Sequence, residues 1–137
     1  MSVAEMQRAM RRRGIPVTDG PTTTATHLPL PSAPVRDPYE GMNKTERLRA
    51  VDLDAMRRVG IIVAWWYERW TFKLANDCRF TPDFVIQKPD GALEVEEVKG
   101  FWRDDARAKV RMFVEQYPFP VRAYSRTRDG WDVETFR

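Results

Sequence analysis

The sequence has one cysteine, Cys78, and one histidine, His27, among its 137 residues. A single cysteine cannot form a disulfide within the chain, and this pair cannot supply a zinc site built from several Cys and His ligands. A Ser-His-Asp triad would have to use His27, which lies in a proline-rich segment. The sequence therefore excludes disulfide-stapled and Cys/His zinc domains, and it offers little to a triad hydrolase.

Long apolar runs are also missing. No stretch approaches the roughly 18 consecutive apolar residues that indicate a membrane span. The first residues, MSVAEMQRAMRRRG, lack the apolar core of a signal peptide. We therefore expect no membrane partner and a cytoplasmic location.

Positive charge is only slightly in excess, with a net charge of +3 and an isoelectric point near 9.2. This balance permits a phosphate-rich partner such as DNA without requiring one. The length fits one domain with a single core.

The chain divides into two parts by composition. Six of the ten prolines lie between Pro16 and Pro38, together with a run of threonines. Such a segment cannot bury enough apolar surface to fold, so it is predicted to be a flexible linker. Before it, Val3–Arg13 has the pattern of a short basic helix ending at Gly14. We therefore predict an N-terminal arm and linker over residues 1–40 and a folded domain over residues 41–137.

The folded part is predicted to begin with a helix that ends near Gly60. Asn43 and Glu46 have the spacing of a capping box, in which each side chain bonds to the other residue's backbone N–H. Apolar residues then recur at helical spacing, which indicates one buried side. The predicted buried side consists of Leu48, Val51, Ala55 and Val59.

The rest of the domain alternates strand and helix patterns. Ile61–Leu74 is rich in β-branched and aromatic residues and is predicted to be one long or bent strand. Thr81–Gly100 contributes two more strands, and Arg103–Tyr117 has a helical stripe. Val121–Phe136 resembles a hairpin that turns at Asp129-Gly130. The expected order is helix, three strands, helix, two strands, in an α/β (α+β) domain with a mixed central sheet flanked by helices.

The turn Pro89-Asp90-Gly91 fixes the register of the two strands from Thr81–Gly100. A proline, an aspartate and a glycine in this order fit a three-residue hairpin loop. Lys88 then pairs with Ala92, and Asp83 lies directly opposite Glu97. We expect their β-carbons to be roughly 4.5–5.5 Å apart.

Two explanations fit this predicted carboxylate pair. Lys99 lies on the same face, two residues after Glu97, whereas Glu94 and Glu96 point to the other face. Facing like charges destabilise a sheet unless something bridges them, and Mg²⁺ binds one or two carboxylates together with waters and substrate phosphate. The alternative is a surface hairpin with mixed charges, in which a Glu97–Lys99 pair has little energetic weight.

The same residues carry a resemblance to a known family. Thr81-Pro82-Asp83-Phe84, followed by Glu97-Val98-Lys99-Gly100, is similar to the signature of the PD-(D/E)XK nuclease superfamily. The wider pattern RFTPDF…LEVEEVKGFWRDDARAKVRMF resembles a group of small phage-borne endonucleases of the Holliday-junction-resolving type. The resemblance covers about residues 42–124. It implies a restriction-endonuclease-like core and Mg²⁺-dependent hydrolysis of DNA phosphodiester bonds, with Mn²⁺ as a substitute cation, in the cytoplasm of a bacterium or of a phage-infected host.

The resemblance also implies roles for individual residues. Asp83, Glu97 and Val98 would be the metal ligands, and Lys99 would contact the phosphate and the attacking water. Glu46 sits where many members carry an additional acidic catalytic residue. The capping box explains Glu46 equally well without catalysis, so both roles stay open.

A nuclease must also hold the phosphates of its substrate. The candidates for this contact lie on the second predicted helix or just before it, although an exposed charged face is the default for each. They are Arg103, Arg107, Lys109 and Arg111. Cutting two strands would require two sites, which predicts a homodimer. A non-catalytic nucleic-acid-binding or virion-associated protein that keeps the fold is the alternative to an active endonuclease.

Overall fold

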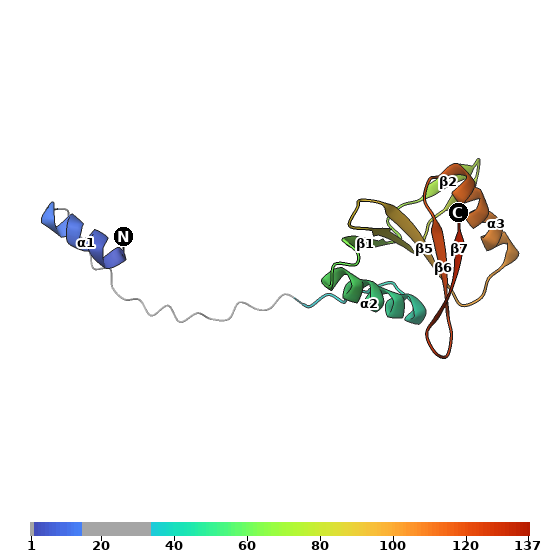
Figure 1. Ribbon diagram of the computed structural model, residues 1–137, viewed down its shortest axis with the longest axis horizontal. Coiled ribbons are helices and arrows are strands. Elements are labelled where there is room, and N and C mark those ends of the chain that lie inside the picture. The colour runs from blue at the N-terminus through green and yellow to red at the C-terminus, as the bar shows by residue number, and fades with distance from the viewer. Residues whose placement is uncertain (1, 15–33) are drawn as a thin grey trace. The chain divides into compact units, whose positions relative to one another are not determined.

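The computed structural model describes residues 2–14 and 34–137, and the chain divides into two units after Val35 (Figure 1). In the first unit, helix α1 (Val3–Arg12) agrees with the predicted short helix. Most of the predicted proline-rich linker lies outside the described residues. No helix in the described part of the chain is both long and apolar enough to cross a membrane.

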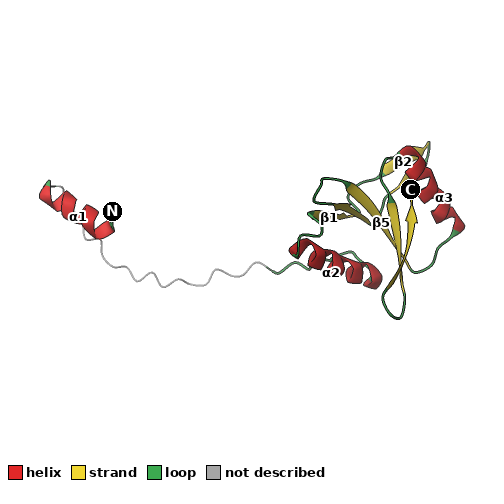
Figure 2. Cartoon of the chain, in the orientation of Figure 1, coloured by secondary structure: helices red, strands yellow, loops and turns green. Residues whose placement is uncertain are grey.

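A five-stranded sheet forms the centre of the second unit, in the order β1-β4-β5-β6-β7 (Figure 2). Its strands are Ala64–Tyr67, Phe84–Gln87, Leu93–Lys99, Val121–Arg126 and Trp131–Phe136, in chain order. All neighbouring pairs are antiparallel except β5 and β6, which are parallel. A parallel pair needs a crossover connection, and helix α3 (Asp104–Gln116) provides it.

Helices cover both faces of this sheet. Helix α2 (Lys44–Arg58) packs on the face that carries Phe84, Ile86 and Val98, where Ala50 and Leu53 are fully buried. Helix α3 packs on the opposite face, where Val85 and Val95 meet Val110 and Phe113. The predicted mixed sheet between helices is therefore confirmed at this level of description.

The predicted single strand over Ile61–Leu74 is wrong. The chain leaves β1 at Glu68, which has a left-handed φ of 42° and donates its N–H to the Asp83 carbonyl at 2.9 Å. It then forms a separate hairpin of β2 (Phe72–Ala75) and β3 (Cys78–Phe80). Five strands therefore precede α3 instead of three. The hairpin has its own core contact, since the rings of Phe72 and Phe113 are 4.9 Å apart.

The predicted buried side of α2 is also wrong. Leu48, Val51 and Val59 are exposed, and Ala55 is exposed with them. The side of the helix that faces the sheet instead contains three charged residues, Glu46, Arg49 and Asp54. Each of them has a hydrogen-bond partner on a strand of the sheet. The buried residues are Glu46, Arg49, Ala50, Leu53 and Asp54.

The predictions for the cap of α2, the extent of α3 and the final hairpin are confirmed. The capping box of α2 is present, with Asn43 Oδ1 accepting from the Glu46 N–H at 2.9 Å and Glu46 Oε2 accepting from the Asn43 N–H at 2.9 Å. Helix α3 begins one residue after Arg103 and ends one before Tyr117. The final strands β6 and β7 form the predicted antiparallel hairpin.

Candidate active site

The β4–β5 hairpin has the register that its loop predicts. Lys88 donates its N–H to the Ala92 carbonyl at 2.9 Å, and Gly91 donates to the Lys88 carbonyl at 2.9 Å. Gly91 has a φ of 86°, the left-handed conformation that favours glycine after such a turn. From there Val85 pairs with Val95 and Phe84 pairs with Glu96. Asp83 therefore lies across from Glu97, one step beyond the last paired residues.

Backbone hydrogen bonds lock the two carboxylates together. Val98 donates its N–H to Asp83 Oδ2 at 2.7 Å, and Asp83 donates its own N–H to Glu97 Oε1 at 3.2 Å. Both side chains are buried, with Asp83 9% exposed and Glu97 3% exposed. Asp83 Oδ1 has no hydrogen-bond partner in the described part of the chain. The pair therefore has fixed geometry and one carboxylate oxygen left for a ligand.

Lys99 is the cation nearest to the pair. Its Nζ lies 2.5 Å from Glu97 Oε2, and the side chain is about a quarter exposed. Burial alone would lower the pKa of Lys99, but the charge and hydrogen bond of Glu97 outweigh it and raise the pKa above its usual value. Lys99 is therefore held as an ammonium beside the carboxylates.

The two carboxylates are costly to ionise together. Burial first, and repulsion by Glu97 second, raise the pKa of Asp83 to about 7, although the Val98 N–H and Lys99 act in the opposite direction. Burial also raises the pKa of Glu97, and Lys99 offsets only part of that effect. Without a cation between them, the carboxylates carry an unfavourable electrostatic energy in the folded protein.

A cavity of about 260 Å³ opens onto this cluster. Besides the two carboxylates and Lys99, three elements line it: hairpin β2–β3, the segment that follows β3, and helix α3. Lys109 is the predicted DNA-contacting residue that the structure places in the cavity, and its Nζ lies 3.4 Å from the Arg79 carbonyl. The other lining residues are Arg79, Phe80, Thr81, Asp105, Ala106 and Val110.

Glu46 approaches this cluster from α2 without joining it. Its Oε2 accepts from the Asn43 N–H and from the Tyr67 hydroxyl, each at 2.9 Å. Its charge raises the pKa values of Asp83 and Glu97, as the smallest of the causes that act on each. Glu46 Oε1 has no hydrogen-bond partner among the described residues. The helix cap is therefore real, and it leaves one oxygen of the carboxylate available.

The three predicted DNA-contacting arginines have different surroundings. Arg107 binds Glu134, with Nη1 and Oε1 2.6 Å apart, and its guanidinium lies 5.0 Å from the Trp102 ring. Arg103 and Arg111 are exposed and do not line the cavity. Of the four predicted contacts, the structure brings only Lys109 to the carboxylates.

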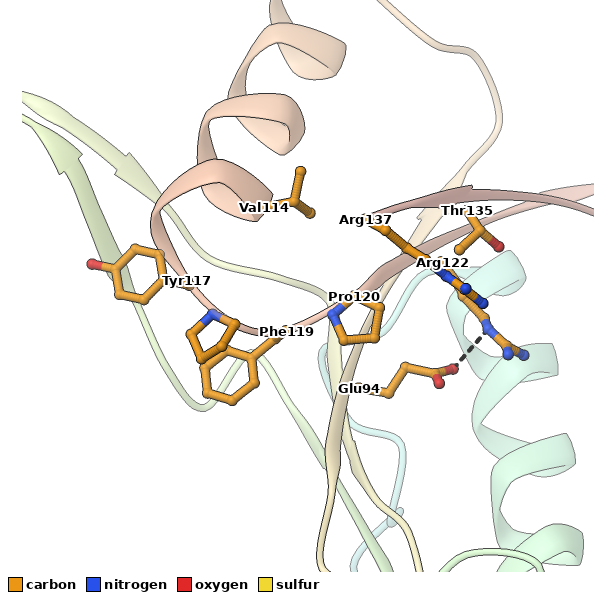
Figure 3. A pocket seen from close by; sticks show the side chains of 9 residues that line it. Glu94, Val114, Tyr117, Phe119, Pro120, Arg122, Thr135 and Arg137 are labelled. Atoms are coloured by element: carbon orange, nitrogen blue, oxygen red, sulfur yellow. Dashed lines mark ion pairs between the residues drawn. The ribbon is translucent and has the colours of Figure 1, made fainter.

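The neighbouring glutamates lie on the other face, as predicted. Glu96 is 3% exposed and accepts two hydrogen bonds from Arg49, at 2.8 and 2.7 Å, which tie β5 to α2. Glu94 lines a larger cavity of about 350 Å³, drawn in Figure 3, where Arg122 Nε lies 3.1 Å from its carboxylate. Lys88 holds the second oxygen of Glu94 at 2.9 Å. That cavity therefore offers no unpaired carboxylate.

The cluster offers few protein ligands to a divalent cation. No group of three or more His, Cys, Asp or Glu side chains in the described ranges lies close enough together to hold a metal ion. Mg²⁺ needs fewer protein ligands, since waters and substrate phosphate complete its octahedron. Asp83 and Glu97 supply two carboxylates. Within an extended strand the Val98 carbonyl points to the same side as its N–H, toward Asp83. The oxygen donors present therefore fit Mg²⁺.

The sequence did not indicate Arg79 and Tyr67 as residues around this site, and it indicated Thr81 only as part of the Thr81–Phe84 signature. Arg79 and Thr81 reach the cavity because β2 and β3 form a hairpin, which was predicted as part of a continuous strand and a loop. Tyr67 reaches Glu46 because β1 ends there. The turn residues Asn76-Asp77 between two apolar runs were the available signal for the hairpin.

Comparison with known proteins adds no assignment. No protein-family model matches this chain, no curated protein matches it, and no solved structure matches it.

Proposed function

We propose that this protein is a Mg²⁺-dependent endonuclease that hydrolyses DNA phosphodiester bonds at Asp83, Glu97 and Lys99. The observation that carries the proposal is the buried carboxylate pair, fixed by backbone hydrogen bonds and open to a cavity that also contains Lys99 and Lys109. A sheet gains no stability from facing carboxylates, so a pair that keeps the unpaired Asp83 Oδ1 accessible suits a site that receives a cation.

The order of elements supports the same proposal. Helix α2, the antiparallel strands β1, β4 and β5, the crossover helix α3 and the parallel strand β6 follow one another. This is the arrangement expected from the resemblance to PD-(D/E)XK nucleases, and we propose a restriction-endonuclease-like core on that basis. The hairpin β2–β3 is then an insertion between the first two strands of the core.

The proposed roles follow from where each side chain lies. Asp83 Oδ1, Glu97 and the Val98 carbonyl would hold the cation, and Mn²⁺ would satisfy the same oxygen donors. Bound Mg²⁺ would supply Lewis-acid stabilisation of the phosphate and a more acidic water. The Lys99 ammonium would neutralise a phosphate oxygen and orient the water. Lys109 would bind a neighbouring phosphate from the far wall of the cavity.

Cleavage of a panel of linear, flapped and branched DNAs tests the proposal, with Mg²⁺, with Mn²⁺ and with EDTA. We expect cleavage with either metal and none with EDTA, and we expect Asp83→Ala and Glu97→Ala to abolish it while both variants remain folded. Asp129→Ala, which changes an exposed loop carboxylate, is the matched control. A variant at Asp83 or Glu97 that cuts at the wild-type rate would remove the proposed site.

The same panel decides the alternative. DNA binding without cleavage in any metal would indicate a non-catalytic nucleic-acid-binding protein that keeps the fold. Light scattering decides the proposed homodimer: about 32 kDa is expected, twice the 16.1 kDa of one chain. A mass of one chain, free and on DNA, would leave an enzyme that nicks single strands.

A further inference from the structure

The loop between β5 and α3 holds one aromatic side chain inside and one outside. Trp102 is half-buried: its ring centroid lies 5.8 Å from that of Phe136 at the end of β7, and the Arg107 guanidinium lies 5.0 Å from it. Its neighbour Phe101 is 82% exposed, the most exposed aromatic among the large hydrophobic side chains that the structure describes. Trp102 therefore anchors the loop and leaves Phe101 pointing into solvent.

Phe101 stands beside the candidate active site. It follows Lys99 by two residues, which places the two Cα atoms at most about 7 Å apart. Gly100 between them adds no side chain, and a β-carbon built there would meet nothing within 4 Å. No side chain therefore stands between Lys99 and Phe101 along the chain.

The surroundings of Phe101 favour an anionic ligand. Lys99, Lys109 and Arg79 line the cavity, and the exposed Arg103 follows Phe101 by two residues. Grooves that bind single-stranded nucleic acid combine such cations, which follow the phosphates, with exposed aromatic rings on which bases stack. Lys99 has Glu97 as its counter-charge, whereas Lys109, Arg79 and Arg103 have no ion-pair partner among the described residues and would stay without one against a purely apolar partner. The combination therefore fits a nucleotide whose base is not stacked on its neighbours.

We propose that Phe101 stacks on an unpaired base next to the scissile phosphate, so that the preferred substrate contains single-stranded nucleotides at the cleavage point. The inference rests on the proposed function, and it specifies the substrate of the same site. A fully paired duplex keeps its bases stacked and offers no exposed face to this ring.

Binding measured without cleavage tests the proposal. The full chain is titrated in EDTA with a fluorescein-labelled single strand and with the matched duplex, and anisotropy is recorded. Phe101→Ala should weaken single-strand binding about 5- to 150-fold, the range for one base–aromatic stack, and change duplex binding less than twofold. Phe101→Trp should retain the single-strand affinity. Val133→Ala, an exposed apolar residue on β7, is the matched control and should change neither.

A modified strand isolates the stacking contact. When the base at the contact position is removed to leave an abasic site, wild-type affinity should fall to that of Phe101→Ala, and the variant should lose nothing further. Equal single-strand affinity for wild type and Phe101→Ala would overturn the proposal, as would equal losses on single strand and duplex. Stacking without any Mg²⁺-dependent cleavage would instead refute the proposed nuclease activity and keep this contact.

Discussion

Replacing Asp83 with asparagine should stabilise the folded protein at neutral pH when no divalent cation is present. Asp83 faces Glu97 in a buried environment, and burial together with this neighbour raises its pKa from 3.8 to about 7. Because the folded-state pKa lies above the unfolded-state value, the folded protein binds the proton more tightly. Wild-type stability should therefore fall as the pH rises through the interval from about 4 to about 7. The asparagine variant should lack this contribution.

The size of the effect follows from the same shift. One pKa unit corresponds to about 1.4 kcal/mol, so a shift of roughly 3 units gives an upper limit of roughly 4 kcal/mol above pH 7. Asparagine keeps the shape and still accepts from the Val98 N–H. The pKa of about 7 already includes the preference of this N–H for the ionised carboxylate, so no separate deduction applies. We therefore expect a gain in the free energy of unfolding of up to about 4 kcal/mol.

Urea denaturation followed by tryptophan fluorescence gives the measurement, at about pH 4 and about pH 8 in EDTA. The gain should appear at the higher pH and be almost lost at the lower one, where Asp83 is protonated in the folded wild type and so is neutral like asparagine. Asp129→Asn makes the same substitution on an exposed loop and should change neither value. Added Mg²⁺ should stabilise the wild type at the higher pH and leave Asp83→Asn unchanged.

Two results would refute this reasoning. A variant that is no more stable than the wild type at the higher pH would mean that the carboxylates do not oppose each other in solution. A gain of the same size at both pH values would mean that asparagine stabilises by packing or by hydrogen bonding, with no contribution from charge.

Three further predictions concern the neighbours of the carboxylate pair. Glu96→Gln should lower the free energy of unfolding by about 3 kcal/mol in urea denaturation, because it leaves Arg49 buried without its counter-charge. Cleavage per folded molecule should persist, and a variant of normal stability would contradict the prediction. Lys99→Ala should abolish cleavage yet retain Mg²⁺ binding in calorimetry. A loss of Mg²⁺ affinity would show that Lys99 supports the metal site and not the phosphate contact. Tyr67→Phe should lower the free energy of unfolding by about 1 kcal/mol, because it removes the hydrogen bond to Glu46. An unchanged free energy of unfolding would show that water replaces the hydroxyl group.

The sequence predicts the carboxylate pair because its geometry is local. Three loop residues, Pro89-Asp90-Gly91, determine the pairing of the strands on either side, and strand alternation then sorts the three glutamates between two faces. The cap of α2 is predictable for the same reason, since Asn43 and Glu46 bond to each other. Short-range chemistry was sufficient for both.

The failures have long-range causes. The buried side of α2 depends on Arg49 meeting Glu96, a residue 47 positions away that no helical periodicity can indicate. The end of β1 depends on Glu68 adopting a left-handed φ and bonding to the Asp83 carbonyl across the sheet.

The pleat of β5 gives two consecutive glutamates opposite effects on the folded state. Glu96 is neutralised by a buried guanidinium, whereas Glu97 faces Asp83 and carries an electrostatic cost. Directed evolution that selects only for cellular abundance would therefore preserve Glu96 and enrich neutral replacements at Asp83 and Glu97. Such a selection would remove the candidate site first and leave the sheet and α2 intact.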